Sequence, residues 1–312
     1  MTKTAFIFPG QGSQSVGMLA TLADDYKVVA ETFVQASSVL GYDLWAVCQN
    51  GPEGRLNSTQ TTQPAMLAAG IATWRCWKQE GGQSPDLMAG HSLGEYSALV
   101  ATGVMGFEDA ISTVALRGRL MQEATPEGVG AMAAILGLDD QVLVGICAEY
   151  AGNEVVSCAN FNSPGQVVIS GHHKAVEQVC EIAGAAGARR TIMLPVSVPS
   201  HCALMKPAAE LLKTAISELS LGSSEIPVIQ NADVQAFSSS PDVIAALARQ
   251  LWQPVKWTDT ILKLKEAGIE RFIECGPGKV LAGLNRRISR ESETIALIDA
   301  TSMDKALGRT ES

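Results

Sequence analysis

Short apolar runs alternate with longer amphipathic segments along most of this chain. Thr4–Phe8 is an apolar run that stops at a proline-glycine pair, and it predicts a buried strand. The run that ends at Gly90 predicts a second strand of the same kind. Tyr26–Leu40 and Pro64–Glu80 show helical spacing, whereas the polar stretch Gln49–Thr62 predicts a loop. Strands and helices that alternate in this way are typical of an α/β protein with a mostly parallel sheet.

The pattern changes past residue 126. The elements predicted there are, in order, a strand, a helix, two strands, a helix and a strand: Ala131–Leu136, Asp139–Tyr150, Glu154–Ala159, Gln166–Ser170, His173–Ala183 and Ala188–Leu194. This order is the ferredoxin-like arrangement. We therefore expect a small ferredoxin-like domain at residues 127–197, inserted into a large α/β domain made of residues 1–126 and 198–312.

Beyond residue 197 the alternation of helices and strands resumes. The predicted strands are Pro227–Gln230, Arg271–Glu274 and Thr294–Ile298, and the predicted helices are Ala203–Ser220, Pro241–Gln250, Trp257–Ala267 and Lys279–Ile288. Earlier in the large domain, Glu108 and Asp109 begin a helix, where acidic side chains suit the positive end of the helix dipole. This helix carries Arg117 and ends near Pro126.

One stretch combines a strand, a tight turn and a helix around a serine. Gly90-His91-Ser92-Leu93-Gly94 fits G-x-S-x-G, the pattern of a nucleophile elbow. Glycines on either side of the serine relieve the crowding in so tight a turn. The start of the following helix then offers free backbone N–H groups to a developing oxyanion. The pentapeptide therefore predicts a serine displayed for nucleophilic attack in a hydrolase-like α/β domain.

A serine nucleophile needs a base, and the chain has four histidines. His91 adjoins the serine, so we expect its side chain to point away from the hydroxyl. His172 and His173 begin a predicted helix of the small domain and are expected to face solvent. His201 lies where the chain re-enters the large domain, and a domain junction is a common place for a site. His201 is therefore the favoured base; no acidic residue stands out as its partner, and a backbone carbonyl can orient it instead.

Composition excludes several classes of protein. With 46% hydrophobic and 18% charged residues among 312, the chain is typical of a globular protein. A net charge of −9 argues against broad nucleic-acid binding. Seven cysteines without a C-x-x-C pair indicate reduced thiols rather than disulfides or a metal site. Because no secretory signal or membrane-spanning run is evident, we expect a cytoplasmic protein that does not contact a membrane.

Two glycine-rich loops were considered as cofactor sites. Gly10–Ser15 follows a strand, but Ser15 stands where a dinucleotide-binding fingerprint has its third glycine. This loop is either a plain tight turn or a segment whose Gln11 faces the elbow serine. Gly276–Lys279 lacks the earlier glycine and the hydroxyl residue of a phosphate-binding loop, so it predicts the turn into a helix.

Six segments together resemble one family, the malonyl-CoA:acyl carrier protein transacylases of bacterial, free-standing type. They occur in the expected order: Phe8–Gln14, Gly90–Tyr96, Arg117–Gln122, Asn160–Gln166, Val196–His201 and Glu274–Val280. Six ordered motifs between Thr4 and about Arg287 are far more specific than the elbow alone. The resemblance implies an enzyme that moves a malonyl group from malonyl-CoA to the phosphopantetheine thiol of acyl carrier protein through a malonyl-serine ester, supplying fatty-acid synthesis.

The resemblance also implies catalytic roles for three side chains. Ser92 would take the malonyl group, and His201 would remove and return its proton. Arg117, which taken alone reads as a surface arginine, would grip the free malonyl carboxylate through paired hydrogen bonds. Because malonyl-CoA is a substrate, the resemblance implies no cofactor and no metal.

Supporting roles follow from the same resemblance. The backbone N–H groups of Gln11 and Leu93 would form the oxyanion hole, and the main-chain carbonyl of Gln250 would orient the histidine. Asn160 and Asn162 would lie beside the cleft and contact the pantetheine arm. The segments at Asn231–Val234 and at Cys275 differ slightly from the family pattern, and we assign them no catalytic role.

Two other functions stay open, and so does the way a partner docks. The elbow also suits a serine thioesterase or carboxylesterase, and a non-catalytic module that binds carrier protein is a third possibility. Acyl carrier proteins are acidic, as is this chain, so docking needs a local basic patch. The pairs Arg189-Arg190 and Arg286-Arg287 are the candidates. No motif demands a dimer, and we expect a monomer.

Overall fold

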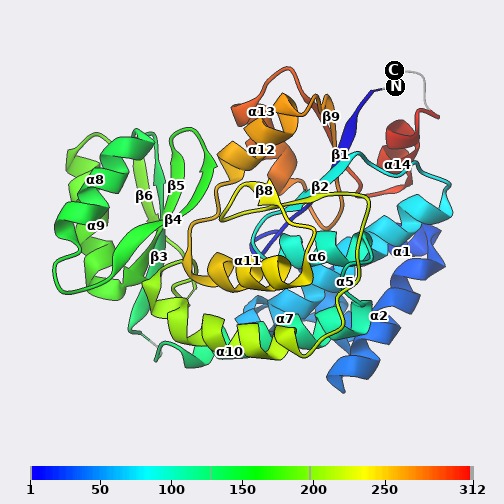
Figure 1. Ribbon diagram of the computed structural model, residues 1–312, viewed down its shortest axis with the longest axis horizontal. Helices are drawn as coiled ribbons and strands as arrows, with labels where there is room; N and C mark the ends of the chain where they lie inside the picture. The colour runs from blue at the N-terminus through cyan, green and yellow to red at the C-terminus, as the bar shows by residue number, and fades with distance from the viewer. Residues whose placement is uncertain (1, 127, 197, 310–312) are drawn as a thin grey trace.

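The computed structural model describes residues 2–126, 128–196 and 198–309, and its strands form two separate sheets (Figure 1). The larger has the order β10-β9-β1-β2-β7-β8, with β1 Thr4–Phe8, β2 Leu87–Gly90, β7 Val228–Gln230, β8 Gln235–Ala236, β9 Arg271–Glu274 and β10 Glu293–Ala296. Neighbouring strands pair in parallel except β8, which pairs antiparallel with β7 at the edge. The predicted α/β class with a mostly parallel sheet is confirmed.

Both faces of the large sheet are buried under helices, as parallel strands require. In β1, Phe6 and Phe8 face one side and Ala5 and Ile7 the other, and all four are fully buried. The phenylalanines share a core with helices α2 (Lys27–Leu40), α5 (Thr59–Gln79) and α7 (Phe107–Glu123). The other face packs on α12 (Trp257–Glu266) and α13 (Val280–Ile288).

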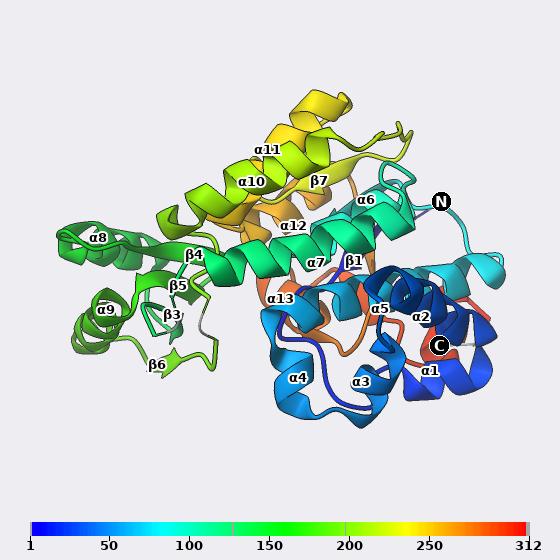
Figure 2. The same cartoon turned by 90° about the horizontal axis from the view of Figure 1, so that it is seen from below.

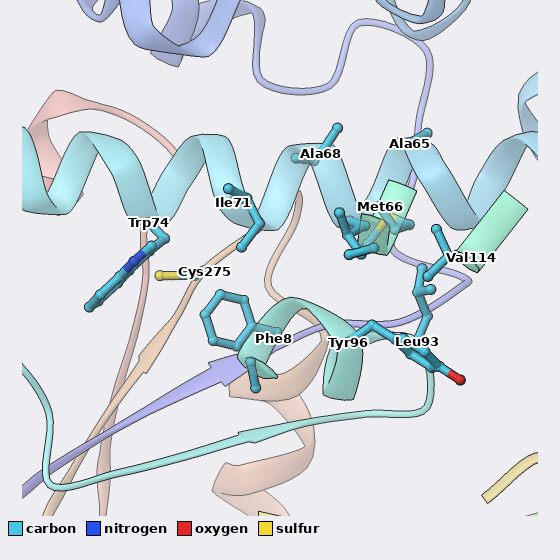
Figure 3. Close-up of a cluster of buried hydrophobic side chains, with 14 of the residues drawn as sticks. Phe8, Ala65, Met66, Ala68, Ile71, Trp74, Leu93, Tyr96, Val114 and Cys275 are labelled. Carbon is cyan, nitrogen blue, oxygen red and sulfur yellow. The ribbon is translucent and has the colours of Figure 1, made fainter. Parts of the chain in front are cut away.

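Helix α5 runs over the phenylalanine side of the sheet, and Figure 3 shows Phe8 beneath it among Met66, Ile71 and Tyr96. The loop predicted at Gln49–Thr62 is wrong, because α4 (Glu53–Asn57) and the first turn of α5 lie within it. Most polar residues of this stretch are exposed on the helices, but the three threonines at its end, Thr59, Thr61 and Thr62, are buried. The Thr62 hydroxyl, for example, donates to the carbonyl of Leu56 at 2.5 Å.

The remaining helices lie around this sheet. They are α1 Ala20–Asp25, α3 Leu44–Asn50, α6 Gly94–Ala101, α10 Lys206–Ser217, α11 Ser240–Trp252 and α14 Ala300–Leu307. The sequence pattern missed α3 and α14, which are short, and the two-residue strand β8. The helix predicted from Ala203 opens with a short 3₁₀ turn at Ala203–Met205 before α10. Among the described residues, no helix has both the length and the apolar composition needed to cross a membrane.

The second sheet has four antiparallel strands in the order β4-β5-β3-β6. Its elements are β3 Gly130–Leu136, α8 Asp140–Tyr150, β4 Val156–Ser163, β5 Gln166–His172, α9 His173–Ala185 and β6 Arg190–Met193. This is the predicted ferredoxin-like order, and it forms the green unit at one end of the molecule in Figures 1 and 2. The predicted boundaries at residues 127 and 197 lie outside the described residues, so the division into domains stays a prediction.

The two faces of this small sheet have different neighbours. Helices α8 and α9 share a core with one face. The other face carries Met132 and Val168, which form a separate apolar cluster with Ala159. Strand β4 joins the sheet to the rest of the chain, because the N–H of Phe161 donates to the carbonyl of Val255 at 2.9 Å. The face without helices is thereby turned towards the large sheet.

Candidate active site

Three neighbouring parallel strands of the large sheet end at the same edge. β1 leads into the loop of Gln11, β2 into Ser92, and β7 into Asn231. Ligands of open α/β sheets bind at the carboxyl ends of the strands. A cleft of about 300 Å³ lies there, closed on its other side by the helix-free face of the small sheet. Its lining includes Gln11, Gln63, His91, Ser92, Leu93, Arg117, Met132, Asn160, Asn162, Val168 and His201.

Ser92 sits on the tight turn between β2 and α6. Its φ is 52°, a left-handed conformation that a side-chain-bearing residue adopts only when its surroundings enforce it. A Cβ on Gly90 would lie 1.9 Å from the carbonyl carbon of Gly94, and a Cβ on Gly94 would lie 2.0 Å from the carbonyl oxygen of Phe8. The crowding that the G-x-S-x-G spacing predicts is therefore present, and only glycine fits at both positions.

Asn231 holds the elbow in this strained shape. Its Oδ1 accepts the backbone N–H of Ser92 at 2.7 Å, and its Nδ2 donates to the carbonyl of Gly90 at 2.6 Å. Its own N–H donates to the buried carboxyl of Glu95 at 2.9 Å. No catalytic role was predicted for this segment, and its part in the site is to hold the backbone of the elbow. The sequence carries no signal for it, because Asn231 and Ser92 are brought together only by the pairing of β2 with β7.

We expect Asn231→Ala to lower the acylation rate of Ser92 about tenfold and the free energy of unfolding by about 2 kcal/mol. The substitution leaves the Ser92 N–H and the Gly90 carbonyl unpaired and releases the strained turn. Urea unfolding and single-turnover acylation of Ser92 by an acyl thioester measure the two effects. Asn153→Ala, at an exposed loop position, is the matched control. Native values for Asn231→Ala in both measurements would contradict this role.

His201 contacts the serine directly. Its Nε2 lies 2.8 Å from the Ser92 hydroxyl oxygen, and its Nδ1 lies 2.7 Å from the main-chain carbonyl of Gln250. That carbonyl is available because the residue four positions on, Pro254, has no N–H to complete the helical bond. With Nδ1–H donated to a carbonyl, Nε2 is left to accept the serine proton. The geometry places Gln250 where the family resemblance implies.

The environment keeps His201 uncharged. Burial lowers the pKa of its imidazole to about 3, with a further contribution from the positive charge of Arg117. The ring is therefore in its basic, neutral form throughout the neutral pH range. An imidazole that accepts the serine hydroxyl proton must be in this form.

The other three histidines lie away from the serine hydroxyl. His91 turns towards the small sheet, where its Nε2 lies 2.7 Å from Oδ1 of Asn162, and its ring packs on Trp257. His173 lies 3.3 Å from the carboxylate of Glu177 on the surface of α9. His172 does not simply face solvent: it is half-buried, and its Nδ1 accepts the backbone N–H of Val155 at 2.8 Å.

Arg117 is buried beside the nucleophile. The prediction of a surface arginine, made without the family resemblance, is therefore wrong. It is only 1% exposed, and one guanidinium nitrogen donates to Oε1 of Gln63 at 2.8 Å. The other donates to Oε1 of Gln250 at 3.0 Å and lies 3.4 Å from the Ser92 hydroxyl oxygen. Burial lowers its pKa. The two glutamines fix the plane of a cation that has no acidic hydrogen-bond partner among the described residues.

Gln63 and the side chain of Gln250 were not identified from the sequence. Gln63 lies between the loop predicted to end at Thr62 and the helix predicted to begin at Pro64, and it is part of the first turns of α5. The Gln250 amide holds two parts of the site at once, because its Nε2 donates to the carbonyl of Ser92 at 2.7 Å while its Oε1 accepts from Arg117. Only the packing of α5, α7 and α11 around the elbow brings these groups together.

Gln11 and Leu93 both line the cleft next to the serine. Within the described part of the chain, neither backbone N–H donates a hydrogen bond to another group. The N–H of Ser92 itself is taken by Asn231. These two groups are thus the free backbone donors beside the nucleophile, as an oxyanion hole requires.

Asn160 and Asn162 lie on β4 and line the opposite wall of the cleft. The carbonyl oxygen of the Asn162 amide is engaged by His91, which leaves its NH₂ group to face a ligand. Asn160 is 7% exposed. Across residues 2–126, 128–196 and 198–309, no three histidine, cysteine or acidic side chains gather as metal ligands would.

A serine on a strand–turn–helix elbow, bonded to a histidine and flanked by free N–H groups, defines an enzyme of the acyl-serine class. The comparisons with known proteins narrow this class. The family model described as "Acyl transferase domain" matches residues 5–305. The chain is 53% identical to the malonyl CoA-acyl carrier protein transacylase of Salmonella typhimurium, covering 98% of this chain and 99% of the relative. It is 44% identical to that of Bacillus subtilis, with coverage of 98% and 97%.

Solved structures of malonyltransferases also superpose closely on this chain. An acyl carrier protein S-malonyltransferase from Vibrio cholerae superposes with a TM-score of 0.95 at 55% identity, covering 97% of this chain and 99% of that one. A malonyl-transacylase solved with a type II PKS acyl-carrier protein superposes with a TM-score of 0.97 at 52% identity, covering 99% and 100%. The chain belongs to the malonyl CoA-acyl carrier protein transacylases of the acyl transferase family.

Proposed function

We propose that this protein transfers a malonyl group from malonyl-CoA to the phosphopantetheine thiol of acyl carrier protein through an ester on Ser92. One observation carries the proposal: the buried cation of Arg117 lies in the same cleft as the Ser92–His201 pair. A serine–histidine pair alone serves any acyl group. A guanidinium beside it selects an acyl group that ends in a carboxylate.

In the first step the Ser92 oxygen attacks the thioester carbonyl while His201 takes the hydroxyl proton. The carbonyl oxygen becomes an oxyanion, which the N–H groups of Gln11 and Leu93 stabilise. The carbon–sulfur bond then breaks, and His201 returns its proton to the departing coenzyme A sulfur. The product is the malonyl-Ser92 ester and free coenzyme A.

In the second step the roles of the thiols are reversed. His201 takes the proton of the pantetheine thiol, whose sulfur attacks the ester carbonyl, and the proton then passes to the Ser92 oxygen as it leaves. The arm reaches the ester along the wall that carries Asn160 and Asn162. No cofactor takes part in this chemistry. We place the reaction in the cytoplasm, where it supplies fatty-acid synthesis, and infer a working monomer because no sequence motif demands a dimer.

Pre-steady-state kinetics separates transfer from hydrolysis. Malonyl-CoA alone should release about one equivalent of coenzyme A per enzyme and then stop, until holo acyl carrier protein is added. Continued release without an acceptor thiol would make the protein a thioesterase. Absence of any burst, with carrier protein still bound, would leave a non-catalytic binding module.

A second groove carries the positive charge that docking of an acidic carrier protein needs. It encloses about 1000 Å³ beside α13 and β6, and in the described part of the chain its charged lining residues are all arginines: Arg189, Arg190, Arg286, Arg287 and Arg290. The two arginine pairs predicted as docking candidates thus lie on one surface. Arg287 donates to Oε1 of Gln166 at 2.6 Å, and Gln166 also lines the catalytic cleft. The groove therefore adjoins the path of the pantetheine arm.

Reversing two of these charges should weaken docking. We expect the double variant Arg286→Glu and Arg290→Glu to raise the apparent KM for holo acyl carrier protein about tenfold at low salt, with a smaller effect at high salt. Steady-state transfer at two ionic strengths measures this, and the malonyl-CoA burst reports an intact site. Arg119→Glu with Lys213→Glu is the charge-matched control on exposed positions elsewhere. An unchanged KM would exclude the groove.

A further inference from the structure

Arg117 and His201 contact the same oxygen atom. The Ser92 hydroxyl oxygen lies 2.8 Å from Nε2 of His201 and 3.4 Å from a guanidinium nitrogen of Arg117. Both side chains are buried, at 3% and 1% exposure. Besides the serine, the guanidinium donates hydrogen bonds to the side chains of Gln63 and Gln250, and both are neutral amides. Among the described residues, the guanidinium that faces the base therefore has no hydrogen-bonded counter-charge.

This arrangement opposes the proton transfer that starts the reaction. When Ser92 attacks, its proton moves to His201 and creates an imidazolium next to the guanidinium. The negative charge that forms at the same time develops on the substrate carbonyl oxygen, which the N–H groups of Gln11 and Leu93 bind. Two like charges in contact in a buried site interact far more strongly than they would in water. The cost falls on the transition state, so it slows the chemical step.

We propose that the carboxylate of the substrate activates the nucleophile, by cancelling the charge of Arg117 as it binds. This inference rests on the proposed function and extends it. Arg117 then has two effects. It binds the malonyl carboxylate, and without that carboxylate its charge slows the proton transfer from Ser92 to His201. Selectivity for malonyl over acetyl is consequently expressed in the acylation rate as well as in binding.

The neighbouring titratable groups set the conditions of a test. The charges of His91 and Arg117 influence the pKa of His201, and the charges of Glu95 and Tyr96 influence the pKa of Arg117. Burial lowers the pKa of His91, which favours its neutral form, and burial raises the pKa of Tyr96 to about 12. Burial raises the pKa of Glu95 to about 7. Glu95 is thus mostly neutral at pH 6 and becomes a partial counter-charge for Arg117 at pH 8.

The test separates the carboxylate from the acyl group. Phenylmethanesulfonyl fluoride is uncharged, and it sulfonylates a serine as the S–F bond breaks, fluoride leaves and the base takes the hydroxyl proton. We expect formate, added at constant ionic strength, to raise the rate at which the sulfonyl fluoride reacts with Ser92 by about tenfold at pH 6. The increase should saturate with formate concentration and should be smaller at pH 8. Chloride should have no effect. Glu95→Gln should show the larger formate effect at both pH values.

Two variants complete the design. Arg117→Gln should react without formate at least as fast as the native protein does with it, and should not respond to formate. Arg119→Gln, at an exposed position on the same helix, should behave as native. Circular dichroism checks folding, and if Arg117→Gln is unfolded the native protein alone decides. A native rate that formate leaves unchanged or lowers at pH 6 would overturn the proposal.

Mass spectrometry of the same preparation distinguishes this proposal from the proposed function. A malonyl adduct on Ser92 without a formate response would refute the activation and leave malonyl transfer standing. A formate response without an adduct from malonyl-CoA would refute malonyl transfer, and with it the activation of the site by a malonyl carboxylate.

Discussion

Replacing His201 with alanine should slow the malonylation of Ser92 about 10⁴-fold. The hydroxyl would then lose its proton to water, although the elbow, the free N–H groups and Arg117 remain. Among the described residues, the only other side chain that contacts the serine oxygen is the guanidinium of Arg117, which is not a base. Rapid-quench measurement with labelled malonyl-CoA in single turnover gives the rate of this step directly.

His173→Ala is the matched control for this variant. His173 lies on the surface of the small sheet's helix α9, paired loosely with Glu177, and its loss should leave acylation at the native rate. A His201→Ala protein that is folded and acylates within tenfold of native would show that another group takes the proton. The half-buried His91, bonded to Asn162, would be the next candidate.

Arg117→Ala should change the substrate that the enzyme prefers. Malonyl transfer should fall about 10³-fold, because the carboxylate would enter a buried site without its counter-charge. Acetyl transfer should be kept or raised, because no unpaired cation then opposes proton transfer to His201. The ratio of kcat/KM for malonyl-CoA to that for acetyl-CoA measures the effect.

The controls for Arg117 separate selectivity from folding. Arg119→Ala removes an exposed arginine from the same helix and should leave the ratio unchanged. Urea unfolding reports any loss of stability, which should follow from leaving the amides of Gln63 and Gln250 without their donor. Equal losses with malonyl-CoA and acetyl-CoA in a folded variant would contradict the carboxylate-binding role.

Local sequence was sufficient where the constraint itself is local. The elbow is predictable because its two glycines must flank the serine at fixed spacing, and the Cβ contacts at Gly90 and Gly94 show why. The ferredoxin-like unit is predictable because its six elements follow one another along the chain. The apolar run Thr4–Phe8 stops at Pro9-Gly10, so β1 could be placed to the residue.

Contacts between groups that meet only through tertiary packing could not be predicted from the sequence. Thr59–Thr62 is polar in composition and was predicted to be the end of a loop, yet it is the first turn of α5. The next residue, Gln63, accepts a hydrogen bond from Arg117. Asn231 is far from Ser92 in sequence and reaches it through strand pairing. Arginine is usually exposed, and the burial of Arg117 depends on α5 and α11 packing against α7.

The position of Gln250 lies between these two cases. Its carbonyl was assigned through the family resemblance, and the local reason is visible in the sequence once the helix end is known. Pro254 removes the N–H that would otherwise bond that carbonyl, so the carbonyl is free for His201. The Gln250 side chain, which connects Arg117 to the Ser92 carbonyl, has no such signal.

Mass spectrometry of the protein after brief exposure to malonyl-CoA tests the central claim most directly. One malonyl group should appear, in a peptide that contains Ser92, and it should disappear when holo acyl carrier protein is added, with malonyl-carrier protein formed in equal amount. Ser92→Ala should carry no adduct. A malonyl group on another residue, or one on Ser92 that the carrier protein cannot remove, would contradict transfer through a malonyl-Ser92 ester.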